Sequence, residues 1–438
     1  MRRVALGSIV LAVVSLTAPS SAAEPSPVVV LRVEGPIDRT VLPYLEERLS
    51  QAERDGSVVV LQLDTAGTLG HDGVALAQRV ADLDVPVLAW VGPTPATAAG
   101  TGLLLMYASS MAGVAPGSQT GPLEPIDLLH PEALPAGLET TIQGWLDDRG
   151  KDTRLERIDE PLPAADAIGL GVAEVAATSV TGFLEEVDGR TVQTPQGPVT
   201  LDTRIATTEA EAGERTVALR FDNLGPIQRL THAIATPSMV YFLLVIGLAA
   251  LAFEITQPGF GFAGFAGTGM LALAAYGLWV APPSIFGIAL LLGGVGALTL
   301  DVRMRNLGIA TVAGLLAFAA GSVFSWSGVA ESIRISPWLI GGAVVASLLY
   351  YGFALTVAIQ SHDRIVNTQK GLIGLLGEAR GKLAPDGPVY VKGAMWRGRT
   401  SGRPIAPGSQ VRVRGVDGLV LRVEEEPTEE PTGAARRS

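Results

Sequence analysis

The chain has 438 residues, of which 48% are hydrophobic but only 5% aromatic, and its formal net charge is −11. This length predicts two or three units rather than one domain. The negative charge argues against nucleic-acid binding, because no basic excess offsets the phosphate charge. The sequence has no cysteine, which excludes disulfides, thiolate metal sites and a cysteine nucleophile. Four widely separated histidines also argue against a histidine-rich metal centre, so no cofactor is expected.

The N-terminus has the pattern of an export signal over residues 1–23. Arg2 and Arg3 precede the apolar stretch Val4–Leu16, and a run of small residues ends at Ala23. A charged start, a short apolar region and a small-residue cleavage site are typical of a signal peptide. The alternative is an uncleaved anchor, although the apolar region is short for a core of about 30 Å. Both interpretations place the following domain outside the cytoplasm.

Residues 24–206 alternate strand-like and helix-like segments. Branched apolar runs predict buried strands, and apolar residues at helical spacing predict helices between them. Such alternation indicates an α/β domain with a mostly parallel sheet, in which loops at the strand ends carry any chemistry. The predicted strands are Val28–Val33, Ser57–Asp64, Val85–Val91 and one near Val172, and the predicted helices are Asp38–Arg54, Asp72–Leu83 and one ending near Gly150.

After an expected juxtamembrane linker over residues 207–236, residues 237–360 contain five apolar segments. The first and third have about 16 residues, where about 20 are usual for a membrane span. Ionisable residues are confined to segment ends, at Glu254 and Asp301, so transport is not expected. The five predicted spans are Met239–Phe253, Phe262–Val280, Ile285–Leu300, Leu307–Trp326 and Trp338–Ile359.

The distribution of basic residues predicts the orientation of these spans. Arg303 and Arg305 follow the third span, and Arg364 and Lys370 follow the fifth. Basic loops favour the cytoplasmic side. We therefore expect a multi-pass protein of the cell membrane, with the α/β domain outside and the C-terminus in the cytoplasm.

Residues 368–426 contain short branched strands separated by Asp-Gly and Pro-Gly turns, which predicts a small five-stranded barrel of OB type. Only Tyr390 and Trp396 could stack on bases, so a protein-interaction or structural role is favoured over nucleic-acid binding. Residues 427–438 are expected to be a disordered tail.

Three regions together resemble the long-form NfeD proteins, which are membrane-bound relatives of the ClpP-class serine proteases. The first is LDTAG at Leu63–Gly67 with the stretch Val85–Gly121, which resembles a ClpP/crotonase-like core. The second is FEITQPGFGFAGFAG at Phe253–Gly267, whose glycines also suggest close helix packing. The third is the barrel sequence from Gly377 to Val423. The resemblance implies a ClpP/crotonase-like domain, membrane helices and an OB barrel, with stomatin- or prohibitin-like partners and self-association.

The catalytic residues that the resemblance implies are missing. Family proteases use a Ser-Lys dyad, with an oxyanion held by backbone amides after a Gly-Gly turn. The nucleophile position holds Ala98, within Thr97-Ala98-Ala99-Gly100. The turn retains Gly67, but its second glycine is replaced by Thr68. The base position falls near Ala133, and no lysine precedes Lys151 anywhere in the sequence.

Few other residues could replace the missing catalytic dyad. Thr97 or Thr101 could offer a hydroxyl beside the empty position, with His71 or His130 as base. The leading hypothesis is a non-proteolytic membrane scaffold that binds a peptide or protein. The alternative is an active membrane-bound endopeptidase that cleaves apolar segments of membrane partners with these non-family residues.

Overall fold

The computed structural model describes residues 28–131, 134–153, 159–206, 215–256, 261–304 and 309–427. The expected signal peptide, Ala133 and nearly all of the expected tail lie outside these residues. The chain divides into two compact units. One comprises residues 1–250, 264–288 and 322–336, and the other comprises residues 251–263, 289–321 and 337–438.

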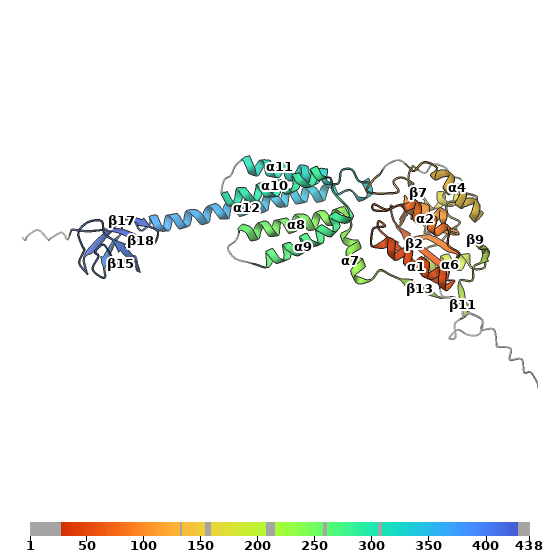
Figure 1. The fold of residues 1–438 in the computed structure, drawn as a ribbon, viewed down its shortest axis with the longest axis horizontal. Coiled ribbons are helices and arrows are strands. Elements are labelled where there is room, and N and C mark those ends of the chain that lie inside the picture. Colours follow the sequence, from red (N-terminus) through yellow and green to blue (C-terminus); the bar gives the residue numbers. More distant parts are fainter. Residues whose placement is uncertain are drawn as a thin grey trace, which may run out of the picture. The chain divides into compact units, whose positions relative to one another are not determined.

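A six-stranded sheet forms the centre of the N-terminal domain, and each pair of neighbouring strands is parallel (Figure 1). Its strands are largely continuous apolar runs, as expected for a sheet covered on both faces. The order across the sheet is β13-β1-β2-β3-β5-β8. The strands are β1 (Val28–Glu34), β2 (Val59–Asp64), β3 (Val87–Val91), β5 (Met111–Val114), β8 (Val175–Ala176) and β13 (Leu219–Asp222).

Helices supply a separate hydrophobic core on each face of this sheet. Five helices contribute buried residues to one core, and α6 (Val180–Val187) contributes Phe183 and Leu184 to the other. This arrangement confirms the predicted α/β domain. The five helices are α1 (Val41–Asp55), α2 (Gly73–Ala81), α3 (Thr101–Ala108), α4 (Leu138–Arg149) and α5 (Ala164–Gly169).

Smaller strands extend the domain. They form a three-stranded sheet of β4 (Thr97–Ala98), β6 (Gln119–Thr120) and β7 (Leu162–Pro163), and two pairs, β9 (Thr191–Thr194) with β10 (Gly197–Thr200) and β11 (Arg204–Ala206) with β12 (Arg215–Val217). The described part of residues 207–236 differs from the expected linker. It contains β12, β13 and helix α7 (Pro226–Ile234), and β13 adds a strand to the central sheet beside β1.

Five apolar helices follow, at the predicted positions. Four are long and apolar enough to cross a membrane, and the fifth, α11, has 17 residues. The first and third have 20 residues each, so they are not short as expected, because the helices continue through polar residues at their ends. The helices are α8 (Pro237–Thr256), α9 (Phe262–Val280), α10 (Ile285–Met304), α11 (Ile309–Ser325) and α12 (Pro337–Lys370), with a short 3-10 helix, η1 (Glu331–Ile333), before the last.

Glycines allow close approach between these helices. A Cβ at Gly247 would lie 2.9 Å from the side chain of Leu271 and 3.2 Å from the carbonyl of Gly267. A Cβ at Gly294 would lie 2.5 Å from the backbone nitrogen of Phe318. Small residues at such contacts are typical of helices that pack in lipid.

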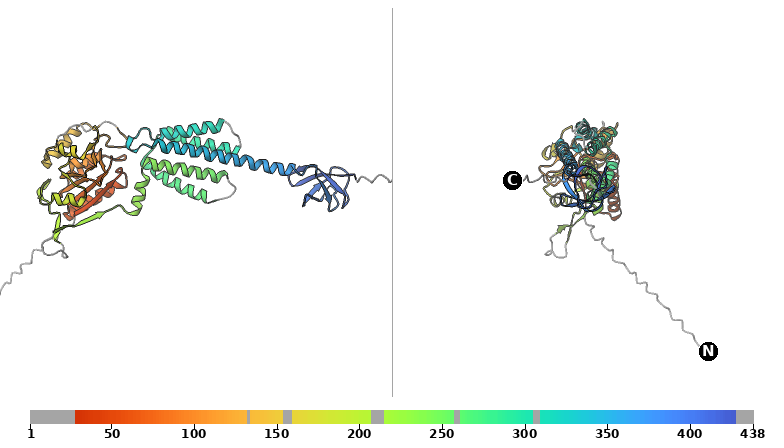
Figure 2. Two further views of the ribbon diagram at one scale, coloured as in Figure 1. Left: turned by 180° about the vertical axis from the view of Figure 1, so that it is seen from behind. Right: turned by 90° about the vertical axis from the view of Figure 1, so that its left-hand side faces the viewer.

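A closed five-stranded barrel follows α12, with strand order β14-β15-β16-β18-β17 (Figure 2). Its core includes Val389, Val411 and Val413, and Trp396 packs against it. This confirms the predicted OB-type barrel. The strands are β14 (Leu376–Ala379), β15 (Asp386–Val391), β16 (Ala394–Arg399), β17 (Gln410–Asp417) and β18 (Val420–Glu425).

Candidate functional site

Ala98 lies on β4, immediately beyond the carboxyl end of β2. Thr65 N donates to the carbonyl oxygen of Thr97 at 2.7 Å, and Thr97 N donates to Asp64 Oδ1 at 3.0 Å. Asp64 therefore supports the loop at a strand end. The Ala98 side chain is fully buried and ends in a methyl group, which offers no nucleophilic atom.

The backbone amides of Thr68, in the turn, and of Ala99, next to Ala98, already donate hydrogen bonds within the domain. Thr68 N donates to the carbonyl of Ile126 at 3.0 Å, and Ala99 N donates to the carbonyl of Thr65 at 2.9 Å. An oxyanion hole needs donors aimed at the oxygen that becomes charged. In this conformation neither amide is available to such an oxygen.

Gly67 keeps the conformational role of a turn glycine. Its φ is +148°, and a Cβ there would lie 2.6 Å from the carbonyl oxygen of Ile126. Thr68 is buried, and its hydroxyl donates to the carbonyl of His71 at 2.7 Å. Thr68 therefore does not need the positive φ that a glycine permits, and its buried hydroxyl has a backbone acceptor.

The chain's own segment Gly121–Leu128 lies along both sides of this position. Gly121 N donates to the carbonyl of Ala98 at 2.7 Å, and Leu128 N donates to the carbonyl of Thr68 at 2.8 Å. A Cβ at Gly100 would lie 2.2 Å from the carbonyl oxygen of Pro125. The segment thus forms hydrogen bonds with backbone groups of both the turn and the loop that carries Ala98.

The possible substitute groups are not brought together. The Thr101 hydroxyl donates to the carbonyl of Ile126 at 3.2 Å, and His130 Nδ1 pairs with Asp127 Oδ2 at 2.8 Å. Burial lowers the pKa of His71. Within the described residues, neither Thr97 nor Thr101 is hydrogen-bonded to a histidine ring.

Lys151 is buried, and its ammonium group is bound within the domain. Its side chain is only 6% exposed, and Nζ donates to the carbonyl of Met106 at 3.1 Å and lies 3.5 Å from Glu174 Oε1. Burial lowers the pKa of Lys151, and the Glu174 carboxylate opposes that change. Glu174 also accepts from Ala112 N at 2.6 Å, so the pair joins the end of α4 to β5.

A contact that the sequence does not predict joins His232 on α7 to Asp38, 194 residues earlier. His232 Nδ1 lies 2.8 Å from Asp38 Oδ2, and Nε2 lies 2.9 Å from the carbonyl oxygen of Glu34. The hydrogen bond to Asp38 raises the pKa of His232, although burial acts in the opposite direction. No local sequence signal relates these residues, because only the folded sheet brings them together.

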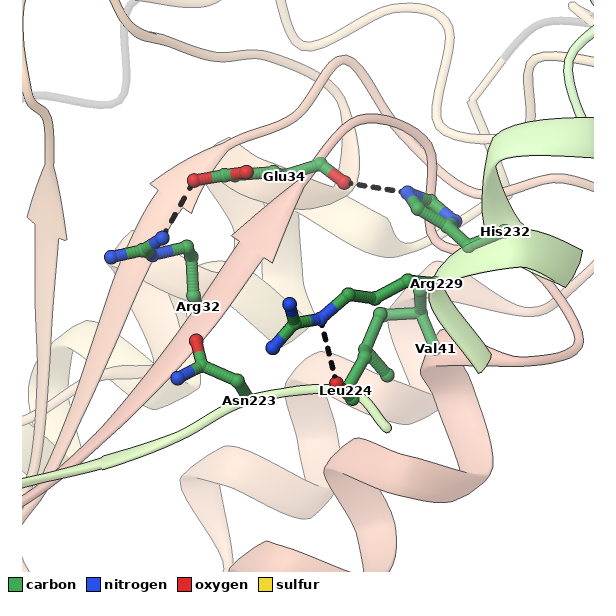
Figure 3. A pocket seen from close by; sticks show the side chains of 7 residues that line it. All are labelled: Arg32, Glu34, Val41, Asn223, Leu224, Arg229 and His232. Carbon is green, nitrogen blue, oxygen red and sulfur yellow. Dashed lines mark hydrogen bonds and ion pairs between the residues drawn. The ribbon is translucent and has the colours of Figure 1, made fainter. Parts of the chain in front are cut away.

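A cavity of about 460 Å³ adjoins this contact (Figure 3). The Arg229 side chain extends across it, and Arg229 Nε donates to the carbonyl of Leu224 at 2.8 Å. Arg32 pairs with Glu34 at 3.4 Å. Among the described residues, no group of three or more His, Asp or Glu side chains could hold a metal ion.

The chain has an α/β domain, apolar helices and a closed five-stranded barrel, in that order, which is the order expected from the resemblance to the long-form NfeD proteins. The family comparisons agree with this class. Residues 238–356 match the NfeD integral membrane domain, and residues 369–425 match the NfeD-like C-terminal, partner-binding domain. The predicted resemblance is therefore confirmed.

Similar proteins are found along the whole chain. The membrane-bound protease PH1510 of Pyrococcus horikoshii is 26% identical over 97% of this chain and 98% of its own length. The solved 1510-N membrane protease of that organism, specific for a stomatin homologue, is 22% identical, with a TM-score of 0.39 over 48% of this chain and 98% of its own. The C-terminal domain of its stomatin operon partner protein 1510-C is 36% identical, with a TM-score of 0.14 over 14% of this chain and 95% of its own.

Proposed function

We propose that this protein is a non-proteolytic membrane scaffold whose ClpP-like domain and C-terminal barrel bind partner proteins. The observation that carries the proposal is Ala98 at the nucleophile position, with the neighbouring amides of Thr68 and Ala99 already hydrogen-bonded to backbone carbonyls. Covalent acyl transfer requires a nucleophile, a base and oxyanion donors together. The candidate site offers a methyl group at the first position, and the only lysine before residue 370 is engaged with Glu174.

The proposed partner is a membrane protein of stomatin or prohibitin type, as the NfeD resemblance implies. A C-terminal domain whose family is described as partner-binding supports this assignment. The basic residues after the third and fifth predicted spans, which are Arg303, Arg305, Arg364 and Lys370, support an external ClpP-like domain and a cytoplasmic barrel. Self-association of the ClpP-like domain belongs to the same proposal.

Hydrolysis is tested with the full-length protein in liposomes. Fluorogenic apolar peptides report turnover, and a fluorophosphonate reports a reactive hydroxyl. We expect neither turnover nor labelling. The Ala98→Ser variant is expected to remain unlabelled, because it restores a hydroxyl without a base. Turnover that is abolished by Thr97→Ala or Thr101→Ala would overturn the proposal and establish an endopeptidase with non-family residues.

Partner binding is tested separately. A purified stomatin-type protein is co-reconstituted with the full chain, or with a variant that lacks residues 369–438, and association is measured by fluorescence energy transfer. We expect the full chain to associate and the shortened chain to lose most of the signal. Equal signals for both would remove the barrel from the proposal, and no signal for either would reject this partner class.

A further inference from the structure

Helix α7 presents an apolar stripe that the rest of the described chain covers at one end only. Ile227, Leu230 and Ile234 occupy positions i, i+3 and i+7, which lie on one helical face. Ile234 is 4% exposed, but Leu230 is 54% and Ile227 is 77% exposed. The stripe therefore begins in a packed contact and continues as uncovered apolar surface.

The packed end of the stripe lies on the apolar helices. A Cβ at Gly277 of α9 would lie 3.4 Å from Ile234 Cγ2 and 2.4 Å from Val240 Cγ2 of α8. Only residues 235 and 236 separate α7 from α8. The C-terminal end of α7 is therefore held at the end of two helices that are long enough to span a membrane.

Two aromatic residues of α9 mark the level of the membrane surface there. Trp279 is 60% exposed near the end of α9, and the Arg39 guanidinium lies 4.5 Å from the centre of its ring. Tyr276 OH lies 3.1 Å from Thr40 Oγ1, which also lies 3.2 Å from Thr231 Oγ1 on α7. Tryptophan and tyrosine favour the boundary between hydrocarbon and headgroups. The C-terminal end of α7 therefore lies at the level expected for that boundary.

The opposite face of α7 is fixed to the ClpP-like domain. His232 contacts Asp38 and the carbonyl of Glu34, and Arg229 is bonded to Leu224. Figure 3 shows the contacts with Glu34 and Leu224. These contacts prevent α7 from rotating about its axis to bury Ile227 and Leu230 against the domain. The exposed part of the stripe therefore has no cover among the residues that the structure describes.

We propose that α7 lies in the headgroup region of the leaflet on the side of the ClpP-like domain, with Ile227 and Leu230 inserted at the acyl boundary. Lipid is the occupant because the stripe is continuous with the start of α8, where Met239 and Phe242 are also exposed, and with the end of α9, where Trp279 is exposed. A helix with one apolar and one polar face binds membrane surfaces in this way. It gives the domain a contact with the bilayer besides the spanning helices.

Because the chain contains no cysteine, single cysteines can be introduced and spin-labelled without other changes. Full-length Ile227→Cys and Leu230→Cys proteins in liposomes are compared with Gln228→Cys on the flank of α7 and Ile168→Cys, an exposed apolar position of the ClpP-like domain. Accessibility to lipid-soluble oxygen and to a water-soluble nickel chelate is measured for each label.

We expect the labels at 227 and 230 to be relaxed several-fold more by oxygen than by the nickel chelate, and those at 228 and 168 to show the reverse. Nickel accessibility at 227 and 230 equal to that at 228 would place the stripe in water and overturn the proposal. Protection from both reagents would also overturn it, because it would indicate cover by protein. The native residues are exposed, so their replacement does not open the core.

Discussion

Substitution of Asp38 tests the link between the ClpP-like domain and α7. Asp38 is fully buried, and its Oδ1 accepts hydrogen bonds from Thr40 N at 2.7 Å and Val41 N at 2.9 Å, which caps the start of α1. Its Oδ2 pairs with His232 Nδ1 at 2.8 Å. Asp38→Ala removes all three interactions, whereas Asp38→Asn retains an acceptor oxygen for the cap and removes the charge.

The expected cost follows from these contacts. Loss of an N-terminal cap costs about 1 kcal/mol, and loss of a hydrogen bond to a charged group costs about 1.5–3 kcal/mol. Asp38→Ala should therefore destabilise the domain by about 3 kcal/mol. For a domain of this size each kcal/mol lowers Tm by about 2–4 °C, which gives a decrease of about 6–12 °C. Asp38→Asn should cost about half as much.

The stabilisation from the Asp38–His232 pair should decrease as pH rises. Because the Asp38 contact raises the pKa of His232, the folded state holds that proton more tightly than the unfolded chain. The stabilisation from the charged pair is fully present below the ordinary histidine pKa of about 6.5. It is lost as pH rises through the raised pKa of the folded protein. The difference in Tm between wild type and Asp38→Asn should therefore be larger at pH 5.5 than at pH 9.

The assay is thermal unfolding in lipid nanodiscs, followed by intrinsic tryptophan fluorescence at one scan rate. His232→Asn and the double variant Asp38→Asn/His232→Asn complete a thermodynamic cycle. Two results would refute the reasoning: an Asp38→Ala midpoint within 1 °C of wild type, or a wild-type advantage over Asp38→Asn that does not change with pH.

Two glycine pairs give further predictions. Gly67→Ala should lower the stability of the ClpP-like domain by about 2 kcal/mol or more, since the φ of Gly67 is +148° and the new Cβ would lie 2.6 Å from a carbonyl oxygen. Gly144→Ala should instead stabilise α4 by about 0.5–1 kcal/mol, because its Cβ would have nothing within 4 Å. Thermal unfolding of both variants checks this, and equal midpoints would contradict it. Gly277→Leu should lower the midpoint of the full chain in detergent by several degrees, because its Cβ would lie 2.4 Å from a neighbouring side chain. Gly269→Leu on the same helix meets nothing within 4 Å and should leave the midpoint within about 1 °C, so equal losses for the two would show that the close contact is unimportant.

The sequence predicts the architecture well because its patterns are local. Short branched apolar runs such as Val28–Glu34 and Val87–Val91 favour buried strands, and stretches of apolar residues long enough to cross a bilayer identify the membrane region. Helices α8, α10 and α12 are longer than the predicted apolar segments, because a helix continues into polar residues once its backbone bonds are formed. Strand β13 was not predicted, since four residues with one exposed aromatic side chain resemble a linker.

The candidate site is predictable only in part. Once the resemblance is recognised, the sequence shows that alanine replaces the nucleophile at position 98 and that threonine replaces the second turn glycine at position 68. The engagement of two amides cannot be read from the sequence, because Thr68 N donates to the segment Gly121–Leu128 and Ala99 N donates to the carbonyl of Thr65, and only the fold brings these groups together. The pairing of Asp38 with His232 is equally inaccessible, since it depends on tertiary contacts between residues 194 positions apart.

The position of β13 determines where the ClpP-like domain can be cut from the rest of the chain. This strand pairs with residues Val28–Leu31 of β1. A fragment ending at residue 206 would lack β13 and would leave that edge of β1 unpaired. An open apolar strand edge promotes association with other sheets. A soluble fragment should therefore extend beyond Asp222, because the short strand between domain and membrane covers the edge of β1 and limits aggregation through that edge.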